Sequence, residues 1–501
     1  FSTRNSNEKV SASWAISHGL APDGGLYVPE SLPMLSLDDI KTLGKKDYRG
    51  RALSIMKPFL DEFTEDELKA MILRAYGDNF DSADTAPVHF LDEKTAVLEL
   101  WHGPTCAFKD MALQMLPHLL TASLKKCGER RKVCILVATS GDTGKAALEG
   151  FADVENTKIL VFYPHNGVSD VQQLQMVTQT GDNVGVAAVR GNFDDAQTGV
   201  KQIFGDAAFA EQLSAKGWFL SSANSINWGR LLPQIVYYFS AYCDYANSGR
   251  VNYGDAVDFV VPTGNFGNIL AAWYAKQIGT PLGTLFCASN ENRVLTDFIN
   301  TGSYDISNRE FVLTPSPSMD ILVSSNVERQ LFELTGRNAQ AIATWMDELK
   351  QNKSFTVDSE TLAKLQADFK SDSVDSETCL ETIKEVLGKH HYLIDPHTAV
   401  AYKVAERLRG ANPVLIASTA HWAKFGENVY RALHDIKPGA ELPASVAELS
   451  GCALNELIAN EANSHNIPQG LAELDSLPIR FKDVIEGTTP AIEKAVIDFL
   501  D

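Results

Sequence analysis

Residues 133 to 151 read VCILVATSGDTGKAALEGF, an apolar run followed by a short polar loop and then a helical pattern. Val133 to Ala138 has the composition of a buried strand, and Lys145 to Phe151 continues as a helix. The loop between them, Thr139 to Gly144, contains the hydroxyl and glycine residues typical of a turn from strand to helix. Such a unit of strand, loop and helix is the element from which parallel sheets covered by helices are built.

The same unit recurs along the chain. The further predicted strands are Ile159 to Tyr163, Val184 to Val189, Val257 to Val261, Thr284 to Ala288 and Val414 to Ala417, each followed by a predicted helix. Because strands joined through helices run parallel, we expect an α/β fold with helices on both faces of the sheets. Ligands of such sheets bind beside the carboxyl ends of the strands, so the loops that follow these strands are the candidates for a functional site.

The composition narrows the class of function. The chain has 501 residues, enough for two or three domains, and its formal net charge of −20 makes a nucleic-acid partner unexpected. It contains no run of about 18 apolar residues, so we expect no membrane span. The cysteines lack CxxC spacing and no His/Cys/Asp cluster has metal-site spacing, so we expect free thiols and no metal. Without a recognisable secretion signal, we expect a cytoplasmic protein.

The chain divides into three predicted regions. Residues 1–95 are expected to form a helical N-terminal domain, residues 96–435 a catalytic region with two α/β subdomains, and residues 436–501 a C-terminal extension. Within the catalytic region, residues from about 335 to 390 are acidic and predict a helical insertion, which Ser371 to Ser373 interrupts. The extension carries no chemistry that the sequence identifies.

Two helix starts stand out in the N-terminal domain. Ser36 and Thr64 each begin a sequence with the spacing of a capping box, in which a hydroxyl and a later carboxylate satisfy free backbone N–H groups. After Thr64, apolar residues recur on one face of a predicted helix: Leu68, Met71, Ile72 and Ala75. Nothing in this domain is catalytic by composition.

A lysine lies at the junction of a turn and an apolar helical run in the segment WHGPTCAFKD, residues 101–110. The backbone N–H groups and the dipole at a helix start, together with partial burial, lower the pKa of an amine. Lys109 would then be suited to form a Schiff base with an aldehyde cofactor. The alternative is a solvated lysine in the first turn of a helix, and these residues alone leave both interpretations open.

The loop Gly264-Asn265-Phe266-Gly267-Asn268 joins a predicted strand to a predicted helix. Its two glycines allow close approach of the backbone, and N–H groups at a helix start are suited to a phosphate. A tight turn without a ligand explains the loop equally well. Neither this loop nor Gly141 to Ala146 matches a dinucleotide or Walker A motif, which makes a nucleotide ligand unexpected.

Three further groups of polar residues follow predicted strands or begin predicted helices. Ser140 and Thr143 place two hydroxyls at a helix start, which suits a carboxylate, although the same loop serves as an ordinary turn. Arg230, after a capping Ser225, would hold a phosphate with two hydrogen bonds or would lie at the surface. The hydroxyl of Thr419 follows the last strand, where such groups ordinarily form local turn bonds.

Together these residues resemble one family, threonine synthase, of the tryptophan-synthase-β type. The order of the motifs matches, and the N-terminal glycine-rich segment and the long insertion resemble the fungal and bacterial form rather than the plant form. The matching segments are Ser2-Thr3-Arg4, Asp23 to Pro29, His102 to Asp110, Ser140 to Gly144, Ser222 to Arg230, Pro262 to Asn268, Asp395 to Ala399 and Ser418 to His421.

The resemblance implies the cofactor pyridoxal 5′-phosphate and a fold type II structure: two parallel-sheet αβα subdomains, a helical N-terminal domain and a helical insertion. Lys109 would hold the cofactor covalently and later move protons. Gly264, Asn265, Phe266, Gly267 and Asn268 would bind its phosphate. Thr419 would face the pyridine nitrogen, and because a hydroxyl does not keep that nitrogen protonated, the ring would be a weaker electron sink than one facing an aspartate.

The resemblance also implies a substrate site. Ser140, Asp142 and Thr143 would face the substrate carboxylate or the ring oxygen of the cofactor, although like charges make Asp142 an awkward partner for a carboxylate. The substrate phosphate would be held by Ser225, Asn227 and Arg230, with Asn292 as a further donor. The sequence leaves the oligomeric state open between monomer and homodimer.

The implied reaction, the last step of threonine biosynthesis, converts O-phospho-L-homoserine and water to L-threonine and phosphate by γ-elimination and β-addition of water. One alternative is a serine/threonine dehydratase-like lyase of the same fold, which needs no second anion site, so Arg230 separates the two. The other is a non-catalytic binding protein that retains the fold, against which the intact Lys109, Gly264 loop and Thr419 argue.

Overall fold

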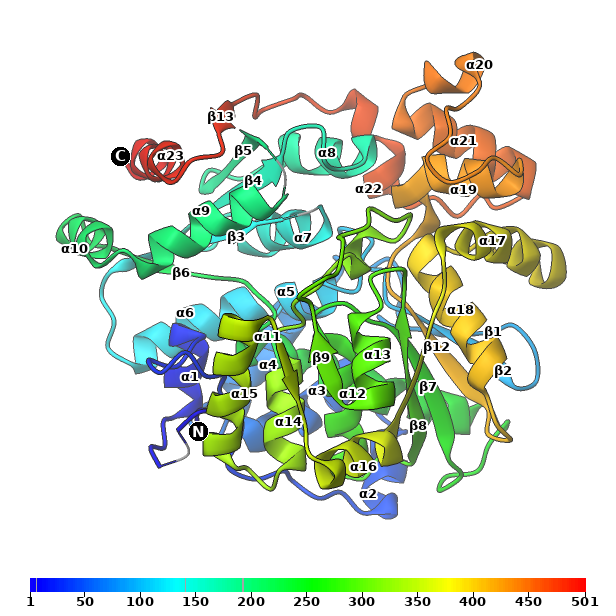
Figure 1. Cartoon of the computed structure of the whole chain (residues 1–501), viewed down its shortest axis with the longest axis horizontal. Helices are drawn as coiled ribbons and strands as arrows, with labels where there is room; N and C mark the ends of the chain where they lie inside the picture. Colours follow the sequence, from blue (N-terminus) through cyan, green and yellow to red (C-terminus); the bar gives the residue numbers. More distant parts are fainter. Residues whose placement is uncertain (6, 140, 192) are drawn as a thin grey trace.

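The computed structural model describes residues 1–5, 7–139, 141–191 and 193–501, apart from the side chains of residues 193 and 194. Figure 1 shows two main β-sheets with helices packed around them, the larger in the lower right of the view and the smaller in the upper left. A third, two-stranded antiparallel sheet pairs β9 (Ser303–Asp305) with β10 (Ser354–Thr356). The two main sheets are built from different parts of the chain, and the segments that carry Lys109 and Arg230 connect them. The expected fold with two parallel-sheet subdomains is confirmed.

The larger sheet has the strand order β1-β2-β12-β7-β8-β11. Its neighbouring strands pair in parallel, except that β1 and β2 form an antiparallel hairpin at one edge. The strands are β1 (Val88–Phe90), β2 (Thr95–Glu99), β12 (Val414–Ser418), β7 (Val257–Pro262), β8 (Leu282–Ser289) and β11 (Phe369–Ser373). β2 and β12 are far apart in sequence but adjacent in space, which brings residues 100–110 beside residues 419–421.

The smaller sheet is wholly parallel, with the order β13-β5-β4-β3-β6. Its strands are β3 (Lys132–Ala138), β4 (Thr157–Pro164), β5 (Val184–Arg190), β6 (Trp218–Ser221) and β13 (Val484–Glu486). Alternate residues of β3 enter different hydrophobic clusters, since Val133 and Ile135 pack with one helical layer and Cys134 and Leu136 with the other. Burial on both faces explains why this strand is continuously apolar in sequence.

The helices have the following bounds. In the N-terminal region they are α1 (Ala12–His18), α2 (Leu37–Leu43), α3 (Tyr48–Met56), the short 3-10 helix η1 (Lys57–Phe59) and α4 (Glu65–Ala75). The next group comprises α5 (Asp110–Leu113), α6 (Leu116–Lys126), α7 (Asp142–Phe151), α8 (Asp170–Val177), α9 (Phe193–Gly205), α10 (Ala207–Ala215) and α11 (Trp228–Asn247). After β7 come α12 (Gly267–Ile278), α13 (Val294–Thr301), η2 (Pro317–Met319), α14 (Val327–Leu334), α15 (Ala339–Asn352), α16 (Ser359–Asp368), α17 (Ser376–His390) and α18 (Pro396–Leu408). The last are η3 (Trp422–Phe425), α19 (Gly426–Leu433), α20 (Ala444–Ala447), α21 (Gly451–Ala462), α22 (Gln469–Ala472), η4 (Leu474–Ser476) and α23 (Thr489–Leu500).

The predicted helix starts are confirmed. Ser36 and Thr64 each form a capping box, with Asp39 and Glu67 as the returning carboxylates. The four apolar residues predicted for one face of α4 are all buried. Across the part of the chain that the structure describes, no helix has the length and apolar character needed to cross a membrane, and no group of three or more potential metal ligands comes together.

The helical insertion is only partly helical. Residues 339–352, 359–368 and 376–390 form helices as expected, but β11 forms between the last two and pairs in parallel with β8. Ser371, which was expected to interrupt a helix, is buried in this strand and donates its hydroxyl to the Cys287 carbonyl at 2.6 Å. The sequence of β11 is polar because it is an edge strand, so helical periodicity did not distinguish it from a helix break.

The C-terminal extension completes the smaller sheet. Its strand β13 pairs with β5 at the sheet edge, and α23 packs on α9 and β4. Figure 1 shows β13 and α23, in red, at the smaller sheet in the upper left of the view, far along the chain from β4, β5 and α9, which they contact. Ile492 and Val496 belong to the same cluster as Leu136 and Phe162. The extension is therefore part of the core of this subdomain.

We predict that Ile492→Ala lowers the free energy of unfolding of the smaller subdomain by about 2 to 5 kcal/mol, because it empties a fully buried site. Urea unfolding followed by tryptophan fluorescence measures the change. Lys494→Ala, an exposed substitution on the same helix, is the matched control and should change stability by less than about 0.5 kcal/mol. Equal effects of the two substitutions would show that α23 does not cover the sheet in solution.

Candidate active site

Lys109 lies at the N-cap of the short helix α5, as the sequence predicts. The turn before it is fixed by Asp110, whose carboxylate accepts the Thr105 N–H at 2.8 Å and the Thr105 hydroxyl at 2.6 Å. Gly103 is required here, because a Cβ at this position would lie 2.5 Å from Cβ of Asp110. Burial raises the pKa of Asp110 to about 6. These hydrogen bonds and this close contact fix the backbone of the turn that carries Lys109.

The Lys109 side chain is buried. Its Nζ donates to the Ser318 hydroxyl at 3.3 Å and lies 3.6 Å from Oδ2 of Asp142. Burial lowers the pKa of Lys109 to about 8, although the negative charge of Asp142 opposes the shift. The positive charges of Arg230 and Lys424 lower this pKa further. An amine with such a pKa is partly neutral near pH 7 and can act as a nucleophile or a base.

Asp142 is held between two lysines. Its Oδ1 lies 2.9 Å from Nζ of Lys424 and accepts the Gln172 amide at 2.9 Å, while its Oδ2 faces Lys109. Burial disfavours the charged form of Asp142, but Lys424 and Lys109 outweigh it and hold the pKa of this carboxyl well below its usual range. The expectation that Asp142 faces a substrate carboxylate is not supported by this geometry, because its oxygens are already engaged. Thr143 is half-buried in the first turn of the same helix, and Ser140 lies outside the described residues.

The loop from Gly264 to Asn268 forms the start of α12. Phe266 adopts the left-handed conformation with φ of 62°, and a Cβ at Gly264 would lie only 2.7 Å from the Ser318 carbonyl. Within the described residues, none of the backbone N–H groups from 264 to 268 donates to a protein atom. Backbone N–H groups without a partner, next to glycines that leave the approach open, form a cradle that can bind an anion. The loop therefore fits the phosphate group of the expected cofactor.

Neighbouring side chains hold this loop from behind. Asn326 donates its side-chain amide to the Asn265 carbonyl at 3.0 Å, and the Ser324 hydroxyl donates to the Gly264 carbonyl at 2.7 Å. The Asn268 side-chain oxygen accepts the hydroxyls of Tyr237 and Tyr238, while its amide nitrogen is buried without a hydrogen-bond partner in the described structure. The carbonyl oxygens of Gly264 and Asn265 are thus bonded to protein donors, and the backbone N–H groups of the loop are left to bind an anion.

Thr419 follows β12 directly beside the Lys109 turn. Its carbonyl accepts the Phe108 N–H at 2.8 Å, and Ala107 and Ala420 form a β-bridge. Among the residues that the structure describes, the Thr419 hydroxyl takes part in no hydrogen bond, although the residue is buried. The hydroxyl and the lysine come from segments far apart in sequence, and the pairing of β2 with β12 brings them together.

Arg230 is buried in the first turn of α11 without a carboxylate partner in the described part of the chain. Its guanidinium donates to the Ala223 carbonyl at 2.6 Å, and burial lowers its pKa to about 10, so it remains charged at neutral pH. A buried cation without a counter-ion is unfavourable unless an anion arrives from outside. Its position, close enough to influence the charge of Lys109, makes it the candidate for binding a second anion.

Two of the expected substrate residues have other partners. Asn227 caps α11 by accepting the Gly229 N–H at 2.8 Å and donates to the Ile16 carbonyl at 2.9 Å, so both ends of its side chain are used. Asn292 bonds to both backbone groups of Val312 and donates to Asp320. Ser225 lies beside the loop from Gly264 to Asn268, since a Cβ added at Gly267 would be 3.8 Å from Cβ of Ser225.

Sequence reasoning missed two residues of the site. Ser318 lies in η2, in a loop without a motif, and its backbone N–H donates at 3.1 Å to Nε2 of His397, whose Nδ1 bonds Asp395 at 2.7 Å. Lys424, five positions after Thr419, is fully buried. The available signal for Lys424 was a lysine a few residues after a buried strand, but the sequence does not show that Asp142 is its partner.

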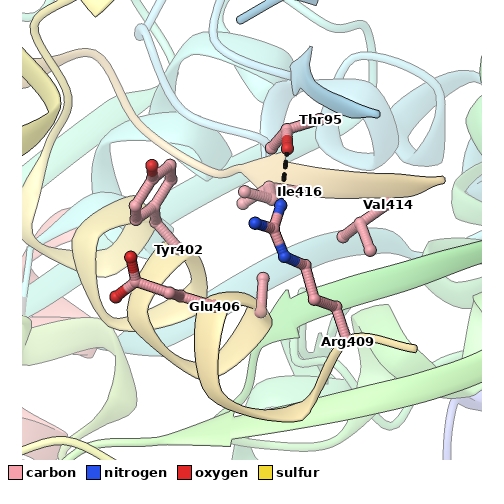
Figure 2. Close-up of a pocket in the computed structure, with 7 residues that line it drawn as sticks. Thr95, Tyr402, Glu406, Arg409, Val414 and Ile416 are labelled. Atoms are coloured by element: carbon pink, nitrogen blue, oxygen red, sulfur yellow. Dashed lines mark hydrogen bonds between the residues drawn. The ribbon is translucent and has the colours of Figure 1, made fainter. Parts of the chain in front are cut away.

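Two cavities of the described structure lie away from these residues. One, shown in Figure 2, lies beside Arg409, which donates to the Thr95 hydroxyl. Its volume of about 10 Å³ is no larger than a single water molecule needs. It lies at the start of β12, whereas Thr419 follows the other end. A larger hollow of about 460 Å³ lies between α8 and the C-terminal extension, and none of the described site residues lines it.

Comparison with protein families covers nearly the whole chain. Residues 1–76 match the model described as "Threonine synthase N terminus", residues 95–419 match "Pyridoxal-phosphate dependent enzyme", and residues 398–496 match "Threonine synthase, C-terminal". These matches agree with the resemblance seen in the motifs.

Individual proteins show the same likeness. The threonine synthase of Pseudomonas aeruginosa is 42% identical over 453 residues, which cover 89% of this chain and 92% of that protein. The threonine synthase-like 1 protein of Homo sapiens is 43% identical over 440 residues, which cover 85% of this chain and 59% of that protein. The chain thus spans less than two thirds of the length of the threonine synthase-like 1 proteins that it matches.

Solved structures extend the likeness to the fold. The PLP-bound threonine synthase from Brucella melitensis has a TM-score of 0.86 at 37% identity, covering 99% of this chain and 98% of that chain. The threonine synthase from yeast has a TM-score of 0.86 at 33% identity, covering 100% and 98%. With the phosphate cradle and the buried lysine in place, pyridoxal phosphate is the cofactor. The chain belongs to the threonine synthase family of fold type II pyridoxal-phosphate-dependent enzymes.

Proposed function

We propose that this protein is a threonine synthase, which converts O-phospho-L-homoserine and water to L-threonine and phosphate. The observation that carries the proposal is that two separate groups of donors near Lys109 are each suited to an anion. One is the loop from 264 to 268, which suits the cofactor phosphate, and the other is the unpaired cation of Arg230. A substrate that carries its own phosphate explains why a second site is needed.

Lys109 would hold the cofactor and, once free, move protons. Its pKa of about 8 is near the working pH, which is the condition for an efficient general base and acid. Bound pyridoxal phosphate supplies a ring that withdraws electrons and acidifies the proton on the α-carbon of an amino acid. We assign to Nζ of Lys109 the removal of this proton, the transfer of the β-proton and the return of a proton to the product.

Arg230 would bind the substrate phosphate and keep it in place as it leaves. Its guanidinium has donors left over after the bond to Ala223, and a buried charge–phosphate contact is stronger than the same contact in water. Ser225, beside the loop, would contribute a hydroxyl to this region. We give Asn227 and Asn292 structural roles, because their side chains are already bonded within the protein.

The remaining roles complete the site. The free hydroxyl of Thr419 would face the ring nitrogen of the cofactor, as the family resemblance implies. Thr143 and Ser140 would face the substrate carboxylate at the start of α7, where N–H groups and the helix dipole favour an anion. Asp142 would act on Lys109 rather than on the substrate, because its carboxylate is engaged by lysines.

Phosphate release from O-phospho-L-homoserine tests the proposal. The wild-type protein should release phosphate and form L-threonine in equal amounts, and Lys109→Ala should lower kcat by at least about 10³-fold because the base is lost. Reduction of the wild-type holoenzyme with borohydride, followed by peptide mapping, should place the cofactor on Lys109. A yellow holoenzyme that releases no phosphate would contradict the assigned reaction, and a protein that stays colourless with added cofactor would favour the binding-protein alternative.

Arg230→Ala tests the second anion site. Loss of a buried phosphate contact should lower kcat/KM for O-phospho-L-homoserine by about 10² to 10³-fold, which corresponds to about 3 to 4 kcal/mol, while the affinity for the cofactor stays within about twofold. Steady-state kinetics and cofactor titration measure the two quantities. Equal loss of cofactor would show that Arg230 serves the cofactor instead, and unchanged kcat/KM together with turnover of L-serine or L-threonine would favour the dehydratase alternative.

Gly264→Ala tests the phosphate cradle. The added methyl group would lie 2.7 Å from the Ser318 carbonyl and force the loop outward, so the Kd for pyridoxal phosphate should rise about 10 to 100-fold. Gly388→Ala, where an added Cβ meets no atom within 4 Å, is the matched control and should leave the Kd unchanged. Equilibrium dialysis measures both, and an unchanged Kd in Gly264→Ala would move the phosphate site elsewhere.

A further inference from the structure

We propose that Lys424 is a positioning residue for Lys109, and that it neutralises Asp142 so that the carboxylate does not trap Lys109 as a permanent ammonium ion. The inference rests on the proposed function, because it takes Lys109 to be the lysine that binds the cofactor. It concerns charges that the protein itself supplies, and it assigns to Lys424 and Asp142 a joint role that is separate from binding substrate.

Lys424 has an unusual environment for a lysine. Its side chain is fully buried in η3, directly after β12. Nζ lies 2.9 Å from Oδ1 of Asp142 and donates to the Thr105 carbonyl at 2.8 Å. Burying an ammonium group costs several kcal/mol unless it is paired, and the contact with Asp142 offsets this cost for Lys424. The bond to Thr105 fixes this charge against the turn that carries Lys109.

Asp142 is shared between the two lysines. Its Oδ1 pairs with Lys424, and its Oδ2 lies 3.6 Å from Nζ of Lys109 and accepts the Ser318 hydroxyl at 3.3 Å. Gln172 supplies a further donor at 2.9 Å to Oδ1. One negative charge therefore faces two potential positive charges. The closer and better bonded of these is Lys424, which leaves Lys109 as the weaker partner.

The other charges near Lys109 do not replace Lys424. Arg230 faces Lys109 from α11 and also disfavours its charged form, but it has no contact with Asp142. Near Lys424, burial raises the pKa of Cys106 to about 12 and lowers that of His421 to about 3, so both are neutral near pH 7. Asp110 has a pKa raised by burial to about 6 and is bonded to Thr105. Lys424 is therefore the cation that directly neutralises Asp142.

The proposed chemistry requires that Lys109 can be both neutral and charged. Lys109 must be neutral to attack an aldehyde or accept a proton, and charged to donate one. A buried Asp142 without Lys424 would hold Lys109 in the charged form, since an opposite charge at this distance raises the pKa of an amine. With Lys424 present, Asp142 orients Lys109 through the Ser318 hydroxyl without holding its proton.

The test compares Lys424→Met, Lys424→Arg, Asp142→Asn and the double variant Lys424→Met/Asp142→Asn in the full-length protein. Two quantities are measured against pH: kcat of the holoenzyme, and the rate at which the protein, after removal of its cofactor, recaptures pyridoxal phosphate, followed by visible absorbance. The second readout depends on the neutral form of Lys109 and does not require turnover. Thermal unfolding and borohydride labelling are recorded for every variant.

Lys424→Met should shift the midpoint of cofactor capture upward by at least about one pH unit, which makes capture near pH 7 about tenfold slower. Asp142→Asn should shift it downward, because Lys424 then faces Lys109 without an intervening negative charge. The double variant removes both charges and should return the midpoint toward that of the wild type. Lys424→Arg keeps the charge and should also stay close to the wild-type midpoint. A purely structural role for Lys424 would give no such opposite shifts.

Unchanged midpoints in Lys424→Met and in Asp142→Asn would overturn the inference, as would a double variant shifted further than either single one. If Lys424→Met does not fold, the comparison of Asp142→Asn with the double variant decides, and a midpoint in the double variant that is no higher than in Asp142→Asn contradicts the inference. Borohydride labelling separates this outcome from failure of the proposed function: cofactor attached elsewhere than Lys109 contradicts the function, whereas a correct label with unmoved midpoints contradicts only the role of Lys424.

Discussion

The buried carboxylate of Asp142 joins the parts of the molecule that make the site. It starts α7 after the first strand of the smaller sheet, yet it contacts Lys424 at the end of the larger sheet and Lys109 before α5. Three buried charges are stable together only when their geometry is good and their remaining donors and acceptors are satisfied. Gln172, Ser318 and the Thr105 carbonyl provide these bonds, so the ion cluster fixes how five segments of the chain meet.

The buried side chain of Arg329 connects the N-terminal region to the segment that holds the loop from Gly264 to Asn268. Arg329 is fully buried and donates to the Tyr27 carbonyl at 2.9 Å, to the Asn326 side chain at 2.6 Å and to the Ile226 carbonyl. Asn326 in turn holds the Asn265 carbonyl of the loop. Beside it, Glu328 accepts both Thr3 and Arg4 from the start of the chain. The start of the chain therefore contacts the same helix that holds the loop from Gly264 to Asn268.

Local patterns predicted much of this structure. The strand that begins at Lys132 was recognisable because both of its faces are buried, and the start of α4 because Thr64 and Glu67 bond to each other within one turn. The turn before Lys109 and the loop from Gly264 were recognisable because each helix start is encoded within one short stretch of chain. The patterns failed for β11, whose sequence is polar, and for β13, which has only three residues, because both become strands through pairing with β8 and β5.

By itself, the sequence determined the two parallel-sheet subdomains, the turn that carries Lys109, the strand-to-helix loop at Gly264 and the family to which the chain belongs, because these depend on periodicity and on short motifs. Only the tertiary structure decided which polar side chains are free. It showed that Asn227 and Asn292 are used within the protein, that Asp142 faces lysines, and that Lys424 is buried beside it. The physical reason is that hydrogen bonding and charge pairing depend on distances between segments far apart in the chain, which composition and spacing do not encode.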